Sequence, residues 1–214
     1  MIQTFSGRNF KKICNQLAKK DAHLAAVLED YGHPPMWTRA NSFESLVHII
    51  LEQQVSLASA LAALRKLQKH TKGVTLERIL KLTDAEMRAC YVSRQKMGYI
   101  RGLAQAIIDG QINLEVMAGL PDDEVRKRLT ALKGIGNWTV DVYLIFVLQR
   151  TDVFPVGDLA AVNAFKKLKS LPKTITREEL TTASESWAPH RTIATMILWH
   201  FYLSERYRLL RATV

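Results

Sequence analysis

The chain has 214 residues, of which 48% are hydrophobic and 23% charged, a balance typical of a soluble globular protein with one domain or two small interlocked ones. Its 30 Lys and Arg against 20 Asp and Glu give a net charge of +10, which favours a polyanionic partner but is also compatible with a merely basic surface. Two cysteines, Cys14 and Cys90, do not suggest a disulfide framework, and the lack of a C-x-x-C pair argues against a zinc site or an iron–sulfur cluster.

The start of the chain does not resemble a targeting segment. Ile2–Ser6 contain no basic stretch leading into an apolar one, as a signal peptide requires. The longest apolar run, Val142–Leu148, has seven residues, far fewer than the roughly 20 that cross a bilayer. We therefore expect a soluble, cytoplasmic protein with no membrane partner.

The dominant period along the chain is helical, and no run alternates with the period of two that a half-buried strand needs. Three helix starts are well marked. Ser42 stands before an acidic first turn, Thr83-Asp-Ala-Glu86 has capping-box spacing, and Pro121 precedes three acidic residues. Helical patterns cover residues 7–28, 42–70, 95–109, 122–132, 137–149 and 188–207. The sequence therefore predicts an all-α fold.

A turn with two glycines, within Leu132-Lys-Gly-Ile-Gly-Asn-Trp-Thr139, joins two of these predicted helices. Gly134 and Gly136 can both take a positive φ and let another backbone approach closely. Such a turn points N–H groups outward at the start of the next helix, where an anion is favoured. The pattern predicts a phosphate-binding turn, although a glycine that simply ends a helix is the commoner case.

A second informative segment, Asp152-Val-Phe-Pro-Val-Gly-Asp158, follows the second of those helices. Pro155 and Gly157 interrupt the chain there, and Asp158 opens another helix. An aspartate at that place is either an N-cap, its commonest use, or a carboxylate with a chemical role. The other nearby carboxylates, Asp141 and Asp152, are expected to be solvated or to cap.

These segments together resemble the helix-hairpin-helix DNA glycosylase superfamily, which has a hairpin, a Gly/Pro-rich loop and a catalytic aspartate. The resemblance extends to Gln53-Gln54-Val-Ser56 upstream and to Trp187-Ala-Pro-His-Arg191 downstream. Asp158 follows Trp138 by 20 residues, which is similar to the alkylation-repair branch, the 3-methyladenine DNA glycosylase II proteins. The resemblance implies one domain over residues 1–214 with two helical lobes, of about 41–150 and of about 1–40 plus 151–214, and an active site in the cleft between them.

The activity implied is base excision, in which a damaged base is flipped out of duplex DNA and its bond to deoxyribose is hydrolysed. Asp158 would stabilise the sugar cation or activate the attacking water. Members that also cleave the strand carry a lysine where this chain has Trp138, and Lys133 occupies a position usually held by proline, so no lyase activity is expected. Alkylated purines such as 3-methyladenine and 7-methylguanine are the expected substrates. Hypoxanthine, uracil or oxidised bases, and a non-catalytic DNA-binding module, are the alternatives.

The predicted base pocket is aromatic. Trp138 offers a stacking surface for an electron-poor base, and Trp37 could close the pocket from the other lobe. Tyr143 and Phe146 follow Trp138 at helical spacing, although such a stripe more often packs a core. His190 stands where relatives can place an aromatic ring, and it could stack, donate a hydrogen bond or cap a helix.

DNA contacts are also implied by the resemblance. Gln54 resembles the residue that intercalates into the gap left by the flipped nucleotide, with an amide satisfied inside a long helix as an equal alternative. The other predicted DNA contacts are Ser56, Gly134, Ile135, Gly136 and Thr139. A Na⁺ or K⁺ ion would be held by the main-chain carbonyls of Thr130, Leu132 and Ile135, with no other cofactor. The protein is expected to act as a monomer on damaged double-stranded DNA, on the nucleoid of a bacterium or in the nucleus of a eukaryote.

Overall fold

The computed structural model describes residues 2–212, with side chains as far as Arg206. Throughout those residues the regular structure is helical, and the sole strand-like feature in them is an isolated bridge between Thr4 and Arg150. The predicted all-α class is therefore confirmed. The chain forms two compact units, one built on Arg39–Leu148 and the other on Gln3–Thr38 together with Gln149–Val214. No helix in the described part of the chain is long and apolar enough to cross a membrane.

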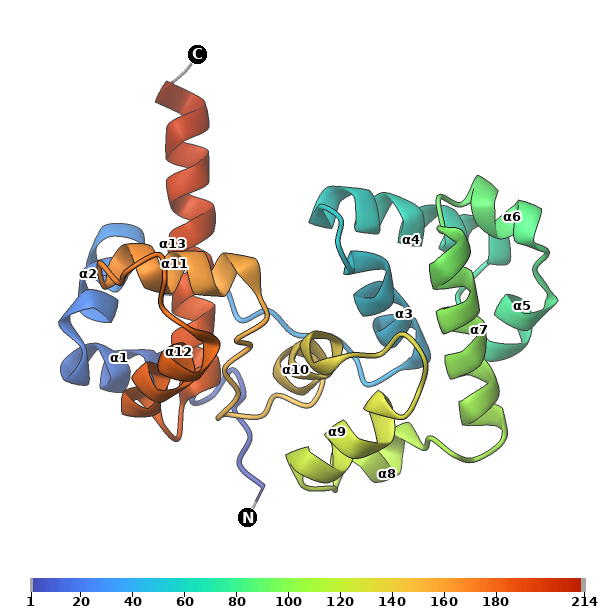
Figure 1. The fold of residues 1–214 in the computed structure, drawn as a ribbon, viewed down its shortest axis with the longest axis horizontal. Coiled ribbons are helices and arrows are strands. Elements are labelled where there is room, and N and C mark those ends of the chain that lie inside the picture. Colours follow the sequence, from blue (N-terminus) through green and yellow to red (C-terminus); the bar gives the residue numbers. More distant parts are fainter. Residues whose placement is uncertain (1, 213–214) are drawn as a thin grey trace. The chain divides into compact units, whose positions relative to one another are not determined.

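The first unit is organised around α3, which packs against α4, α7 and α10 (Figure 1). Leu46, Val47 and Ile50 of α3 and Leu144 of α10 are fully buried, so these helices supply the centre of the core. The helices of this unit are α3 (Phe43–Glu52), α4 (Leu57–Thr71), α5 (Leu76–Lys81), α6 (Asp84–Ala89), α7 (Arg94–Ile108), α8 (Leu114–Ala118), α9 (Asp122–Thr130) and α10 (Asn137–Phe146).

The helical period across residues 42–70 proves to be two helices, with a tertiary contact at the break between them. In a continuous helix the carbonyls of Leu51 and Gln53 would accept from the N–H groups of Val55 and Leu57. Here both carbonyls accept from Nζ of Lys96 on α7, each at 2.8 Å. The chain turns at this point, and α4 begins afresh behind its own N-cap. Periodicity alone could not indicate this break.

The second unit is organised around α13 (Arg191–Ala212), which packs against α1, α2 and α11. Figure 1 shows the blue N-terminal helices beside the orange and red C-terminal ones. Two hydrogen bonds join the chain segments, from Phe5 N to Gln149 O at 2.9 Å and from Thr151 N to Gln3 O at 3.1 Å. The other helices are α1 (Phe10–Lys20), α2 (Ala22–Tyr31), α11 (Leu159–Leu168), α12 (Arg177–Ser184) and the short 3₁₀ helix η1 (Glu185–Trp187).

Two predicted helices of this unit have different bounds in the structure. The pattern over residues 7–28 is divided at Asp21, whose side chain accepts from the N–H groups of His23 and Leu24 and so starts α2 separately. The pattern over residues 188–207 becomes α13 only from Arg191, because Pro189 has a fixed φ and no N–H to donate.

All three marked helix starts are confirmed. The side chain of Ser42 accepts from Ser45 N, Thr83 and Glu86 form a full capping box, and Pro121 directly precedes the acidic first turn of α9. Three short helices were not predicted because they offer too few turns for a period to show. They are α5, α8 and α12, each of which has a capping side chain at its start, from Thr75, Asn113 and Thr176.

Candidate functional site

The predicted phosphate-binding turn lies between α9 and α10, and only one of its two glycines needs to be glycine. Gly134 has φ of +87°, and a Cβ at this position would overlap the ring of Tyr99 on α7. Gly136 has φ of −100°, and a Cβ added there would meet no atom within 4 Å, so this glycine uses neither the positive φ nor the close approach that its lack of a side chain allows. The close approach that matters is therefore between Gly134 and an aromatic ring.

The turn delivers the start of α10 without a side-chain cap. Gly136 is the N-cap residue and has no side chain with which to accept from the first N–H groups. An exposed glycine at a helix N-terminus leaves room for an anion, which the helix dipole also favours. The first N–H groups of α10 are thus not capped by a side chain from Gly136, and the phosphate-binding role of the turn stays a prediction.

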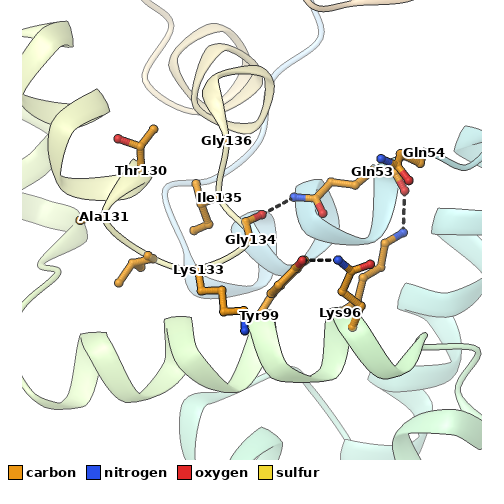
Figure 2. Close-up of a pocket in the computed structure, with 12 residues that line it drawn as sticks. Gln53, Gln54, Lys96, Tyr99, Thr130, Ala131, Lys133, Gly134, Ile135 and Gly136 are labelled. Carbon is orange, nitrogen blue, oxygen red and sulfur yellow. Dashed lines mark hydrogen bonds between the residues drawn. The ribbon is translucent and has the colours of Figure 1, made fainter.

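The side chain of Gln53, the residue that follows α3, holds the glycine turn in place. Nε2 of Gln53 donates to the carbonyl of Gly134 at 2.8 Å (Figure 2). It also donates to Oγ1 of Thr139 at 3.0 Å. Thr139 is buried, and its hydroxyl accepts this hydrogen bond, so its side chain does not face solvent. Gln53 stands in the upstream motif, but no feature of the sequence indicated that it would bridge two segments.

Gln54, the predicted intercalating residue, lies outside any helix. It is exposed and has a positive φ of 56°, so the alternative of an amide satisfied inside a long helix is wrong. The carbonyls of Leu51 and Gln53, which precede Gln54, accept from the ammonium group of Lys96. Burial lowers the pKa of that ammonium group. Ser56 is exposed and caps α4 by accepting from Ser59 N at 3.2 Å. The turn is therefore held by Lys96 on one side and by the cap of α4 on the other, and it exposes Gln54 to solvent.

A pocket of about 500 Å³ lies between the turn at Gln54, the glycine turn and α7. Figure 2 shows Gln53, Lys96 and Tyr99 around it. The residues whose carbonyls were expected to hold a monovalent cation, Thr130, Leu132 and Ile135, also line the pocket. Within the described residues no three His, Cys, Asp or Glu side chains are grouped so as to hold a metal ion.

The aromatic residues of α10 differ in exposure. Trp138 is half-buried near the start of the helix. Tyr143 is fully buried and donates from its hydroxyl to Oδ1 of Asn41 at 2.8 Å, which is the position of a core residue. Phe146 is half-buried, with the guanidinium of Arg39 at 5.2 Å from its ring centroid. Trp138 and Phe146 are therefore the partly accessible members of this stripe, whereas Tyr143 belongs to the core.

The carboxylates near the two motifs have distinct partners. Asp141 is buried on α10 and accepts from Nη2 of Arg126 at 2.6 Å, which braces the hairpin. Asp152 forms a two-point pair with Arg191, at 2.8 and 2.9 Å. Burial raises the pKa of the Asp152 carboxyl, but the hydrogen bonds from Arg191 outweigh it and the net shift is downward. Asp152 also accepts from Arg191 N at the start of α13, as expected for a cap, whereas Asp141 is a buried ion-pair partner and neither solvated nor a cap, so the expectation is wrong for Asp141.

Asp158 is the N-cap residue of α11, and Oδ1 accepts from Ala161 N at 2.9 Å. The same oxygen accepts from the indole Nε1 of Trp199 on α13, also at 2.9 Å. Its own N–H donates to the carbonyl of Pro155 at 2.8 Å, so the Pro/Gly loop ends in a fixed turn. Asp158 is half-buried, and its carboxylate is oriented from two helices at once.

Two residues of the predicted base pocket, Trp37 and His190, belong to the same unit as Asp158. Trp37 is half-buried in the segment that follows α2. His190 is half-buried, and its Nδ1 is buried with no hydrogen-bond partner among the described residues. Burial, and to a lesser degree Lys20, lower the pKa of His190, so the ring is neutral at pH 7. Trp187 next to it is buried and donates to Oδ2 of Asp21 at 2.7 Å, in keeping with a structural role.

Comparison with known proteins agrees over most of the chain. Residues 47–190 match the family model described as HhH-GPD superfamily base excision DNA repair protein. DNA-3-methyladenine glycosylase 1 of Schizosaccharomyces pombe is 32% identical over 88% of this chain and 89% of its own length. The structure of the S. pombe 3-methyladenine DNA glycosylase in complex with abasic DNA has a TM-score of 0.80 at 32% identity, covering 88% of this chain and 95% of that one. A DNA-3-methyladenine glycosidase from Bacillus halodurans has a TM-score of 0.75 at 29% identity, covering 94% and 92%.

Proposed function

Because the chain belongs to the HhH-GPD superfamily of base excision DNA repair proteins, we propose that it is a monofunctional DNA glycosylase that removes alkylated purines from duplex DNA. The likeness in sequence and fold to the S. pombe 3-methyladenine DNA glycosylase, over 88% of this chain, carries this proposal. The substrates are purines of the 3-methyladenine and 7-methylguanine type, whose electron-poor rings are good leaving groups.

Asp158 is the group assigned to the chemistry. When the glycosidic C–N bond breaks, its electron pair leaves with the base and positive charge develops on the sugar. A fixed carboxylate beside the anomeric carbon stabilises that charge, and it can also accept the proton of the attacking water. The products are the free base and an abasic sugar that carries the new hydroxyl. The two hydrogen bonds to Oδ1 support a carboxylate that is already oriented before DNA binds.

The absence of strand cleavage follows from Trp138, which stands where lyase members have the amine that forms a Schiff base. Lys133 stands at the position usually held by proline, and the ammonium group of Lys96 is held by two backbone carbonyls, so neither is proposed as a replacement. Treatment of the reaction products with and without hot alkali separates the two activities. The wild-type protein should give cut strands only after alkali.

The hairpin is assigned to phosphate and Gln54 to the gap in the duplex. Gly134, Gly136 and Thr139 would contribute backbone N–H groups from the turn and the first turn of α10, and Ile135, whose own N–H donates to Leu132 O, would shape the turn between them. The hydroxyl of Ser56 would contact the DNA backbone close to Gln54. Gln54 is exposed on a rigid turn, which suits insertion between bases.

A monovalent cation fits the carbonyls at the end of α9. The carbonyl of Leu132 accepts from Ile135 N at 3.2 Å, which uses one of its two lone pairs. Thr130 ends α9, where the last carbonyls have no intrahelical partner and the helix dipole is negative. Bound by Thr130, Leu132 and Ile135, Na⁺ or K⁺ would link the hairpin electrostatically to a DNA phosphate.

We assign the base contacts to Trp138 and Phe146 of one unit and to Trp37 and His190 of the other, with the two tryptophans as stacking surfaces, while Tyr143 supports Trp138 from the core. Aromatic stacking surfaces bind a cationic base more tightly than a neutral one. Because few side chains are available to hydrogen-bond the edge of the base, selection among lesions depends on how easily each nucleotide flips out of the duplex. The neutral state of His190 supports this proposal, because a histidine cation would repel a cationic base.

The test is excision from duplexes that each contain one lesion: 3-methyladenine, 7-methylguanine, 1,N6-ethenoadenine, hypoxanthine, uracil or 8-oxoguanine. We expect fastest release of the two alkylated purines. Faster release of uracil or 8-oxoguanine would overturn the substrate class, and release of no base together with tight DNA binding would indicate a binding module. The protein should elute as a monomer, and we place it with the chromosome, in the cytoplasm of a bacterium or the nucleus of a eukaryote.

A further inference from the structure

The carboxylate of Asp158 is held by a residue that the sequence motifs do not include. Trp199 lies 41 positions further along the chain, on α13, and its indole Nε1 donates to Oδ1 of Asp158 at 2.9 Å. Its side chain is only 8% exposed, so the indole is fixed by the core around it. The bond therefore joins the start of α11 to the central helix of its unit.

A capping contact alone would not set the carboxylate plane. Ala161 N donates to Oδ1 from within α11, which is the usual contact of an N-cap aspartate and fixes that oxygen from one side. The indole approaches the same oxygen from α13, a different element that packs tightly against α11. Two donors in different directions restrict rotation of the carboxyl group and keep a charge-assisted hydrogen bond on the ionised form.

We propose that Trp199 is a positioning residue for base excision, which holds the Asp158 carboxylate in the orientation that meets the positive charge on the sugar. The inference rests on the proposed function, because it requires that charge to develop beside Asp158. Trp199 acts through Asp158 and does not touch the substrate.

The same unit contains a matched pair with no such role. Trp187 is 1% exposed and donates from its indole to Oδ2 of Asp21 at 2.7 Å, and Asp21 is likewise the N-cap of a helix. Lys169 forms an ion pair with the same Asp21 oxygen at 2.6 Å, so this carboxylate is neutralised in place. The two tryptophans share burial and chemistry and differ in which aspartate they hold. Trp187→Phe is therefore a control for the general effect of losing an indole donor.

The test compares two duplexes that differ in charge at one position. One carries a pyrrolidine in place of the deoxyribose, whose protonated nitrogen mimics the sugar cation, and the other carries a neutral tetrahydrofuran. Wild type should prefer the pyrrolidine duplex, and Asp158→Asn should lose the preference. Trp199→Phe should reduce the ratio of the two affinities about 10- to 100-fold, the range for a hydrogen bond to a charged group. Trp187→Phe should leave the ratio within about threefold of wild type.

The outcomes separate this inference from the proposed function. If Asp158→Asn keeps the preference, the role given to Asp158 is wrong. If Asp158→Asn loses it while Trp199→Phe keeps it, the positioning role of Trp199 is wrong. A loss of similar size in Trp187→Phe also overturns it, because the effect would then be general. Since both affinities come from one preparation, their ratio does not change if a variant is partly unfolded. Single-turnover release of 7-methylguanine should fall with the ratio, while affinity for undamaged DNA stays within about threefold.

Discussion

The substitution Gly134→Ala tests how the hairpin is held against α7. Gly134 combines a φ of +87° with a site that has no room for a Cβ, because the ring of Tyr99 lies there. Alanine therefore meets both backbone strain and overlap with a side chain. Gly136, two residues on, meets neither, so Gly136→Ala is the matched control.

The expected magnitude follows from these two terms. A left-handed conformation costs about 1–2 kcal/mol for a residue other than glycine. Forcing extra volume into a packed site costs about 1–3 kcal/mol. Even a combined loss of about 2 kcal/mol corresponds to roughly 30-fold weaker DNA binding, if the turn must regain its native form to contact phosphate. The same loss lowers the Tm by about 4–8 °C in a protein of this size.

Thermal unfolding and fluorescence anisotropy measure the two effects. Gly134→Ala should lower the Tm and weaken binding to damaged and undamaged duplexes alike, while Gly136→Ala should leave the Tm within about 1–2 °C of wild type. Adding Tyr99→Ala to Gly134→Ala should recover the steric part of the loss and not the backbone part. Equal Tm losses for the two glycine variants would refute the argument from Tyr99. A change in lesion preference alone would refute the anchoring role.

Asp158→Asn should slow base release at least about 10²–10³-fold while DNA affinity stays within about threefold, as measured by single-turnover excision and anisotropy; near-normal release would exclude Asp158 as the catalytic group. Gln53→Leu removes two hydrogen bonds of about 0.5–1.5 kcal/mol each and should weaken binding to all duplexes, so an effect confined to damaged DNA would contradict its bracing of the hairpin. The lowered pKa of His190 means that the unfolded chain binds more protons, so stability should fall as the pH drops below about 6.5. Tm measurements between pH 7.5 and 5 should show a weaker fall in His190→Gln, and parallel curves would contradict the assignment.

Local signals in the sequence predicted the helix starts well, because a cap and its partner lie within four residues. The capping box at Thr83 and the acidic turn after Pro121 are examples. The motifs also singled out the glycine turn and Asp158 before their surroundings were known. The break after Gln53 was not predicted from periodicity, and the carbonyls that it frees accept from Lys96 on another helix.

The contacts that make a given residue necessary were harder to predict than its place in a motif. Gly134 is required because of Tyr99, which is distant in sequence and belongs to no motif. Gln53 bonds to Gly134 across 81 positions, and Trp199 bonds to Asp158 across 41. Contacts of this length depend on how helices pack, and neither periodicity nor composition contains that information.

The division of the chain into units has a consequence for the order of folding during synthesis. Residues 39–148 form one unit from a continuous stretch, whereas the unit that contains Asp158 needs both chain segments. Within it, Tyr31 donates to Glu205 across 174 positions, so α1 and α2 leave the ribosome long before their partner α13 exists. We expect the stretch with the glycine turn to complete its core first, and the support of Asp158 to form last. A nascent chain would then form the turn proposed to bind phosphate before it completes the support of the carboxylate proposed to act in base release.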